Sequence, residues 1–316
     1  MRALVYQDRQ LQLIDCPKPE PGEDEVLIKV LMAGICTTDL EIIQGYLNYT
    51  GIIGHEFVGE VVLDPKDEYT GKRVVGSINI PCNTCDYCQR GMEKHCRNLK
   101  QLGIRGKDGA FAEYMALPRQ NIHSVPESIS NLEAVLVEPM AAGVEIAEQL
   151  HIRPEDEVVI LGDGKLGLVT AMALWSMGAN VKLVGKHENK LIIAQQLGIP
   201  TCYPDEVDGE FKVVVECTGR PSGMSMAQSI VEPQGTIVVK TTIKEMPAFD
   251  LSEIAINEIN ILGSRCGPFE PTLRLIERNE LPLEELVERV FSLEEWKEAI
   301  STARKKGVLK VVFRME

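Results

Sequence analysis

Short apolar, strand-forming runs that are broken by polar residues recur through the first eighty positions of the chain. Clear examples are "RALVYQD", "EVLIKVLMAG" and "KRVVGSI", and turn-forming pairs such as Pro21-Gly22 and Thr70-Gly71 separate the runs. Short runs rich in Val, Ile and Tyr, bounded by turn residues, are typical of β-strands. The pattern therefore predicts a β-rich domain at the start of the chain.

A different pattern covers residues from about 155 to 265. Near-continuous apolar runs such as "EVVILGDG" and "FKVVVECTG" alternate with helical segments such as "KLGLVTAMALWSMG". Apolar strands that alternate with helices indicate a parallel sheet covered on both faces. The last fifty residues predict a helix over 270–278, another near "SLEEWKEAISTARKKG" and a closing strand "VLKVVFRM". The expected fold class is α/β, with a doubly wound parallel sheet and a second, β-rich domain.

Composition and charge narrow the possible partners. The chain has 316 residues and is 44% hydrophobic, which is enough to bury a sizeable core. Its formal charge of −14 disfavours binding to nucleic acids and to anionic membranes. No segment approaches ~18 uninterrupted apolar residues, and charges inside the first apolar run argue against a signal peptide. We therefore expect a cytoplasmic protein whose thiols stay reduced.

Four of the nine cysteines lie in one short stretch, "PCNTCDYCQRGMEKHC". They are Cys82, Cys85, Cys88 and Cys96. Zinc binds four thiolates in a tetrahedron, and C-x2-C steps let successive sulfurs reach one ion. The stretch therefore predicts a structural zinc lobe over residues 81–97 that leaves no coordination position open. Reduced thiols in a loop and an iron–sulfur site are the alternatives.

The segment "VVILGDGKLGLVTA" carries three glycines directly after an apolar strand and at the start of a helix. Gly162 permits a tight turn, Gly164 lets the backbone approach a pyrophosphate, and Gly167 lets the helix pack close to the strand. The free N–H groups of the first helical turn, which includes Lys165 and Leu166, would face the phosphates. The segment predicts a dinucleotide site, and a glycine-rich turn without a ligand is the alternative.

The end of the next strand, "LVGKHENK", bears on which cofactor binds. An acidic residue in this place would bond the adenosine ribose hydroxyls and favour NAD. Here Gly185, Lys186 and His187 fill the place, and the first carboxylate is that of Glu188. A small residue followed by cations leaves room for a 2′-phosphate and attracts it, so we expect NADP to be favoured. The alternative is that Lys186 is a solvated charge and that NAD is used.

A second metal site is indicated by residues that are far apart in the sequence. "MAGICTTD" contains Cys36, "IIGHEFVGEVV" contains His55 and Glu56, and "AVLVEPMAAG" contains Glu138. Taken singly, a cysteine on a strand is more often packing, and a histidine after glycine can simply close a turn. Taken together, a cysteine, a histidine and carboxylates are the ligand set of a zinc that keeps an open position for chemistry.

These motifs resemble those of a known family. "GICTTDLEIIQGY", "GHEFVGEV" and "DGAFAEYM" are similar to the G-I-C-G-T-D, G-H-E-x-x-G-x-V and G-x-F-A-E-Y segments of zinc-dependent medium-chain dehydrogenases/reductases. "VEPM" resembles the V-E-P-L of the sorbitol- and glucose-type members. The resemblance implies a GroES-like catalytic domain over 1–139 and 267–316, and a Rossmann cofactor domain over 140–266.

The resemblance also implies roles for single residues. Cys36, His55, Glu56 and Glu138 would hold the catalytic zinc, and Thr38 would accept the substrate's proton. Asp39 would orient a ligand, and Lys310 would meet the cofactor pyrophosphate unless it is an edge-strand lysine in solvent. The family likeness places four residues in the substrate pocket: Tyr46, Phe111, Arg265 and Phe269. Thr37 and Glu41 depart from the family pattern, and Glu41 leaves the exit of the proton relay open.

The expected activity is hydride transfer between NAD(P) and an alcohol or polyol, or its carbonyl product. Two zinc ions per chain are expected, one catalytic and one structural, and the assembly expected is a homodimer or homotetramer. Two alternatives remain at this point. One is a biosynthetic reductase dedicated to a single carbonyl compound, and the other is a non-enzymatic nucleotide-binding relative.

Overall fold

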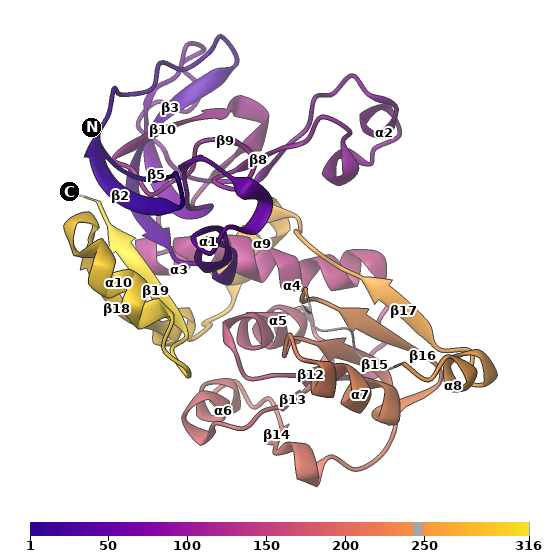
Figure 1. Cartoon of the computed structure of the whole chain (residues 1–316). Coiled ribbons are helices and arrows are strands. Elements are labelled where there is room, and N and C mark those ends of the chain that lie inside the picture. The colour runs from indigo at the N-terminus through magenta and orange to yellow at the C-terminus, as the bar shows by residue number, and fades with distance from the viewer. Residues whose placement is uncertain (243–248, 316) are drawn as a thin grey trace. The chain divides into compact units, whose positions relative to one another are not determined.

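The computed structural model of the chain describes residues 1–242 and 249–315 (Figure 1). The chain divides into two compact units, the first formed by residues 1–138 and 286–316 and the second by residues 139–285. The first boundary lies within one residue of the expected position. The return to the first unit comes at residue 286 and not at 267, because helix α9 (Phe269–Arg278) packs on α5 (Lys165–Ser176) within the second unit.

A seven-stranded sheet forms the body of the first unit. Its strand order is β11-β6-β5-β3-β19-β18, and β10 also pairs with β3. Strand β3 has buried residues on both faces, with seven of its ten residues buried, which suits its central position. The strands are β3 (Glu25–Gly34), β5 (Glu56–Leu63), β6 (Arg73–Gly76), β10 (Tyr114–Pro118), β11 (Ile122–Ser124), β18 (Val287–Ser292) and β19 (Lys310–Arg314).

Two small sheets and several short helices complete the first unit. One sheet has the order β2-β1-β4 and the other the order β7-β8-β9. Their strands are β1 (Arg2–Gln7), β2 (Gln10–Asp15), β4 (Gly51–Ile52), β7 (Asn79–Ile80), β8 (Lys100–Leu102) and β9 (Gly106–Lys107). The helices are α1 (Thr37–Ile42), α2 (Asp86–Gln89), α3 (Asn131–Val135) and α10 (Trp296–Ala303), with 3-10 turns η1 (Tyr46–Asn48), η2 (Glu93–His95), η3 (Arg119–Asn121) and η6 (Leu293–Glu295).

The second unit is built on a six-stranded parallel sheet with the order β14-β13-β12-β15-β16-β17. Successive strands go first to one side of β12 and then to the other, as in a doubly wound fold. The strands are β12 (Glu157–Leu161), β13 (Asn180–Val184), β14 (Thr201–Cys202), β15 (Phe211–Glu216), β16 (Val231–Val239) and β17 (Asn260–Gly263). The helices are α4 (Val137–Gln149), which begins at the unit boundary, α5, α6 (Glu188–Gln195), α7 (Pro221–Ile230), α8 (Leu251–Ile256) and α9, with η4 (Pro204–Glu206) and η5 (Leu283–Leu286).

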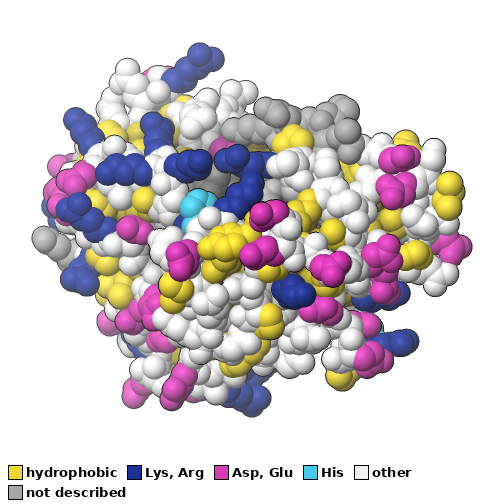
Figure 2. All heavy atoms as spheres, turned by 90° about the horizontal axis from the view of Figure 1, so that it is seen from below, with side chains coloured by type: hydrophobic (Ala, Val, Ile, Leu, Met, Phe, Trp, Pro, Cys, Tyr) yellow, Lys and Arg dark blue, Asp and Glu magenta, His cyan; other side chains and the backbone are white. Residues whose placement is uncertain are grey.

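The apolar residues of these strands form the core that the sequence pattern requires. Val159, Leu161 and Val214 of the parallel sheet pack with Met224 and Ala227 of α7 in one buried cluster. Charged side chains of both signs are interspersed with hydrophobic ones over the face shown in Figure 2. Across the described ranges, no helix combines the length and the apolar character needed to cross a membrane.

Candidate active site and metal centres

Three potential metal ligands come together where β3 ends and its neighbour β5 begins in the first unit. Strand β3 pairs with β5 so that Gly34 lies opposite Glu56, which brings Cys36, just past the end of β3, near the start of β5. The sulfur of Cys36, a ring nitrogen of His55 and a carboxylate oxygen of Glu56 all lie within 4.8 Å of one another. His55 and Glu56 are buried, and Cys36 is half-buried. Sheet pairing therefore assembles the ligand set that the sequence indicated.

Asp39 holds this corner of the site in place. Its Oδ2 accepts a hydrogen bond from the backbone N–H of Cys36 at 2.7 Å, and its Oδ1 lies 3.2 Å from Nδ1 of His55. Both side chains are almost completely buried. Burial lowers the pKa of His55, but the negative charges of Asp39 and Cys36 more than offset this and raise it well above its ordinary value. A cation is thus favoured here, and the buried soft and basic donors fit zinc.

Glu56 has a buried cationic partner. Nζ of Lys310 donates to Oε2 of Glu56, and the two side chains are 0% and 1% exposed. Burial lowers the pKa of Lys310, but the negative charges of Glu56 and Cys36 raise it by more, so the pKa lies above its ordinary value. The interpretation of Lys310 as an edge-strand lysine in solvent is wrong, because its side chain is fully buried. Its role toward the cofactor stays a prediction.

Two further residues of the expected catalytic set lie at different distances from the cluster. Oγ1 of Thr38 is 3.8 Å from the Cys36 sulfur, so its hydroxyl lies at the edge of the site. Glu138 lies in the first turn of α4, half-buried, and is not one of the three residues whose ligand atoms lie within 4.8 Å of one another. Burial has the largest effect on the pKa of Lys310 and lowers it, and Glu56 and Cys36 raise it. Glu138 is near enough for its charge to raise this pKa too, by a smaller amount.

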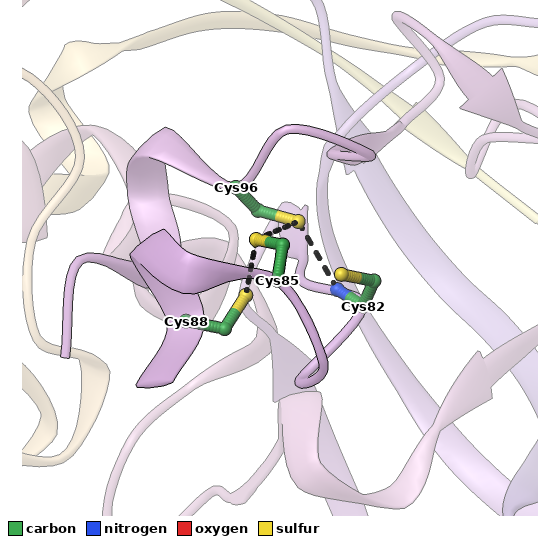
Figure 3. A group of neighbouring side chains, drawn as sticks. All are labelled: Cys82, Cys85, Cys88 and Cys96. Atoms are coloured by element: carbon green, nitrogen blue, oxygen red, sulfur yellow. Dashed lines mark hydrogen bonds between the residues drawn. The ribbon is translucent and has the colours of Figure 1, made fainter. Parts of the chain in front are cut away.

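The cysteine lobe brings its four thiols together, as Figure 3 shows. The sulfurs of Cys85 and Cys88 are 3.5 Å apart, and those of Cys85 and Cys96 are 3.8 Å apart. Zinc–sulfur bonds of about 2.3 Å in a tetrahedron separate the sulfurs by about 3.8 Å. Hydrogen bonds from Thr84 lower the pKa of Cys82 to about 5, so a thiolate is favoured there. The donors and their spacing fit a zinc ion.

The glycine-rich loop lies at the carboxyl end of β12, beside the point where the strand order reverses. Gly162 has a φ of +115°, which side chains rarely adopt, and a Cβ on Gly167 would lie 1.8 Å from the carbonyl oxygen of Gly162. A Cβ on Gly164 would meet no atom within 4 Å, so the space beside this residue is open. Gly164 is also the N-cap of α5. The turn, the open space and the helix N-terminus fit a dinucleotide pyrophosphate.

The pocket residues expected from the family likeness are found in different surroundings. Tyr46 is 44% exposed in the first unit, and Arg265 and Phe269 belong to the second. Phe111 is fully buried, and its ring is edge-on to that of Phe313, with the ring centroids 5.0 Å apart. The ring also packs against Gly54, where a Cβ would lie 2.3 Å from Cδ1 of Phe111. The expectation that Phe111 lines a pocket is therefore wrong, because the ring is packed in the core.

Comparison with known proteins agrees with this geometry. Residues 22–127 match the family model for the alcohol dehydrogenase GroES-like domain, and residues 166–278 match the model for zinc-binding dehydrogenase. An L-threonine 3-dehydrogenase of Streptomyces avermitilis is 35% identical over 290 residues, which cover 83% of each chain. The chain belongs to the zinc-binding medium-chain dehydrogenase family.

Two other relatives refine this placement. A sorbitol dehydrogenase of Halalkalibacterium halodurans is 26% identical over 94% of this chain and 93% of its own. The crystal structure of a zinc-binding dehydrogenase from Sinorhizobium meliloti bound to NADP has a TM-score of 0.91 and 28% identity, with 99% and 98% of the two chains covered. The chain is a medium-chain dehydrogenase of the sorbitol dehydrogenase-like branch, an NAD(P)-dependent oxidoreductase that acts on an alcohol or its carbonyl product. The predicted fold class and enzyme class are confirmed.

In this medium-chain dehydrogenase the structure also reveals a residue that the sequence analysis missed. Asp163, between the first two glycines of the loop, is 7% exposed and reaches the end of β13. Its Oδ2 accepts from the backbone N–H groups of Lys186 at 2.6 Å and His187 at 2.7 Å, and lies 2.9 Å from Nδ1 of His187. Burial raises the pKa of Asp163, but the hydrogen bonds from His187 and Lys186 outweigh it and lower that pKa.

The side chain of Asp163 also explains Gly185. A Cβ at Gly185 would lie 2.5 Å from Cβ of Asp163 and 2.6 Å from its Oδ2. The room above this glycine, which the sequence assigned to a 2′-phosphate, is filled by Asp163. The only sequence signal for this contact was that the variable position of G-x-G is acidic. The dinucleotide fingerprint assigns no role to that position.

Proposed function

We propose that this dehydrogenase oxidises a secondary alcohol or polyol, with two zinc ions per chain. The observation that carries the proposal is the buried group of Cys36, His55 and Glu56, which lies beside the hydroxyl of Thr38. The similarity to a sorbitol dehydrogenase supports a polyol as the substrate class. The second zinc would be held by the four thiols of the lobe and would stabilise structure, since four thiolates would leave no coordination position open.

The residues divide into fixed and exchangeable ligands. Cys36 and His55 would be the fixed ones, because Asp39 holds the backbone N–H of Cys36 and lies beside the ring of His55. Glu56 and Glu138 would be the exchangeable ones. A carboxylate binds metal through one or two oxygens, and Glu56 already has a second partner in Lys310.

The chain's own groups would orient the substrate and move its proton. Bound zinc supplies Lewis-acid chemistry, which lowers the pKa of a substrate hydroxyl. Oγ1 of Thr38 would accept the hydroxyl proton and pass it on towards the cofactor ribose, because a hydroxyl can donate one hydrogen bond and accept others. The glycine loop and the N-terminus of α5 would hold the dinucleotide that receives the hydride.

We propose that NADP is favoured over NAD. Lys186 is exposed two residues after the end of β13, and His187 follows it, so two basic residues lie at the strand end where the adenosine ribose binds in this fold. The similar Sinorhizobium meliloti structure, which is bound to NADP, supports this choice. Replacing Lys186 by Asp should weaken NADP binding and move the preference towards NAD in a calorimetric titration. Tighter binding of NAD than NADP by the unmodified protein would contradict the proposal.

We further propose that the protein is a homodimer or homotetramer in the cytoplasm. Strand β17 is the last in the sheet order of the second unit, and it exposes Ile261. Leu251 and Ile256 of α8 are 73% and 79% exposed. A sheet edge beside exposed apolar side chains is a surface suited to a second copy of the chain. None of the nine cysteines, all of which lie among the described residues, forms a disulfide, which suits a reducing compartment.

A panel of alcohols, polyols and aldoses, assayed with both nicotinamides, tests the activity. Oxidation of several polyols at the carbinol carbon is expected, with loss of rate when Thr38 is replaced by Val. Turnover of one elaborate carbonyl compound alone would favour the dedicated reductase. Binding of the dinucleotide without turnover of any member, by protein shown to contain two zinc ions, would favour the non-enzymatic relative.

A further inference from the structure

We propose that Asp163 reads the adenosine ribose of the cofactor, in the place of the acidic residue that β13 lacks, and so keeps NAD binding possible beside NADP. The inference deepens the proposed cofactor choice and rests on the family's use of a dinucleotide. It concerns only residues 163 and 185–187, all of which belong to the second unit.

The first argument is position. In dinucleotide-binding folds the ribose-reading carboxylate follows the second strand, about 20 residues after the glycine loop. In this chain the backbone of that place, Gly185 to His187, carries no carboxylate of its own. The carboxylate of Asp163 lies there instead, within 2.6–2.7 Å of the N–H groups of Lys186 and His187. In this chain the glycine loop therefore supplies the carboxylate that the end of the second strand supplies in other dinucleotide-binding folds.

The second argument is the remaining hydrogen-bonding capacity of this carboxylate. An ionised carboxylate offers about four acceptor sites. Among the described residues, three donor contacts fall on Oδ2, whereas Oδ1 receives one contact, from Nδ1 of His187 at 3.1 Å. The ring nitrogen is shared between the two oxygens, so Oδ1 keeps the capacity to accept from a further donor. A ribose 2′-hydroxyl is such a donor, whereas a 2′-phosphate offers mainly acceptors and negative charge.

The third argument is the balance of charge. Asp163 carries a negative charge, since its pKa is lowered. The side chain of Lys186, whose backbone N–H binds Asp163, is a solvent-exposed cation. The carboxylate therefore opposes a 2′-phosphate that Lys186 attracts. Gly185 is required for this arrangement, because any side chain there would overlap Asp163 and Leu191. The strand end carries two opposing determinants of cofactor choice rather than one.

Asp163→Asn separates ribose recognition from a merely structural role. The amide keeps an oxygen for the backbone N–H groups of Lys186 and His187, and it removes the charge. Calorimetric titration of the protein with NAD and NADP should then show weaker NAD binding. The ratio of the two dissociation constants should move about tenfold or more towards NADP, because losing a hydrogen bond to a charged group typically has an effect of this size. Adenosine 5′-monophosphate and adenosine 2′,5′-bisphosphate, which lack the nicotinamide, should show the same change of ratio.

Three further variants make the result interpretable. Asp163→Ser keeps a short acceptor without charge and should move the ratio in the same direction. Lys186→Ala should move it the opposite way, by weakening only the 2′-phosphorylated ligands. Asp205→Asn, an exposed aspartate in η4, should leave both constants unchanged.

An unchanged ratio, equal weakening of both cofactors, or a move towards NAD in the folded Asp163→Asn protein would each overturn the proposal. The ratio is measured against the unmodified protein, so it can be interpreted whichever cofactor that protein prefers. A failure of the NADP proposal, which is the preference of the unmodified protein itself, is therefore distinguishable from a failure of the role assigned to Asp163.

Discussion

Lys310 and Glu56, which are 254 residues apart in the sequence, form an ion pair in which both side chains are buried. The pair forms because β19, which begins at Lys310, and β5, which begins at Glu56, lie on either side of β3. The glycine at position 34 is part of the arrangement, since a Cβ there would lie 2.6 Å from Oε2 of Glu56 and 2.8 Å from Cγ1 of Val135. A potential zinc ligand is thus tied to the last strand of the chain.

Replacing Lys310 by Met should destabilise the first unit strongly. The Glu56 carboxylate would be left buried without its partner, and breaking a buried pair from one side typically costs about 3–5 kcal/mol. Urea unfolding measures the loss. Lys310→Arg is the control, because it keeps the charge and should retain much of the stability. Equal unfolding midpoints for the Met variant and the unmodified protein would show that the pair contributes little.

Replacing Cys88 by Ser should remove the zinc of the lobe. Three thiolates remain close together after the change, but a closed tetrahedral site needs four donors. Metal analysis should show one zinc per chain in place of two, and the melting temperature should fall. Cys16→Ser, a change outside both metal groups, should leave the metal content at two. A Cys88→Ser protein with two tightly held zinc ions would contradict the assignment.

Cys36→Ala and Glu138→Ala should have different effects on the catalytic zinc. Cys36 would be a fixed ligand, so its loss should abolish activity and leave only the zinc of the lobe. Glu138 would be exchangeable, so its loss should reduce activity and weaken zinc binding about 10–100-fold without abolishing it, as changes around a metal site typically do. Chelator competition on both variants measures the difference. An active Cys36→Ala protein with two zinc ions would disprove the ligand set.

The stability of the first unit should fall in acid in a way that depends on Asp64. Burial raises the pKa of this carboxyl, but hydrogen bonds from the backbone N–H groups of Tyr69 and Lys66 and from Arg119 outweigh it and lower the pKa below 3.8. The stabilisation is therefore fully present above about pH 4 and is lost as the pH falls through the lowered value.

Asp64→Asn should reduce this acid dependence and lower the free energy of unfolding at pH 7 by about 1–3 kcal/mol, because the N–H donors around this side chain lose a charged acceptor. Urea unfolding between pH 2 and pH 7 gives both quantities in one series. Asp24→Asn is the control, because Asp24 pairs with Lys66 at the surface and is 82% exposed. If both variants show the same acid dependence as the unmodified protein, Asp64 does not have the assigned role.

Ile256→Glu should weaken self-association. The side chain is 79% exposed on α8, and a buried carboxylate in an interface carries a large desolvation cost. Light scattering with size-exclusion chromatography should show a smaller species for this variant than for the unmodified protein. Ile192→Glu on α6, at a side chain that is 46% exposed, should leave the assembly intact. A monomeric unmodified protein would contradict the proposed oligomer.

The sequence predicted those parts of the fold that depend on local periodicity. Runs such as "EVVIL" and "FKVVVE" became parallel strands because apolar side chains on both faces need cover on both sides. The return of the chain at residue 286 was not predicted, because it depends on α9 packing on α5 and not on any local signal. Helix periodicity identifies the apolar face but not its partner.

The candidate site was predicted where spacing or motif fixes the chemistry, as for the cysteine lobe and for Cys36 with His55. The sequence did not reveal contacts made between distant segments. Nothing near Lys310 indicates that it is buried against Glu56, and nothing near Asp163 indicates that it bonds to the backbone of residues 186 and 187. Phe111 fits a family motif, yet its packing against Phe313 depends on the closing strand.

The late position of β19 has a consequence for the order in which the chain matures on the ribosome. The second unit is a single continuous segment, so all of its strands have been synthesised before residues 286–316 of the first unit are added. The seven-stranded sheet must wait, because β3 gains its neighbour β19 only when residues 310–314 emerge. Until then Glu56 has no counter-charge from Lys310. Domains generally fold as units during synthesis, and here the metal-binding corner is completed only after residues 310–314 have been synthesised.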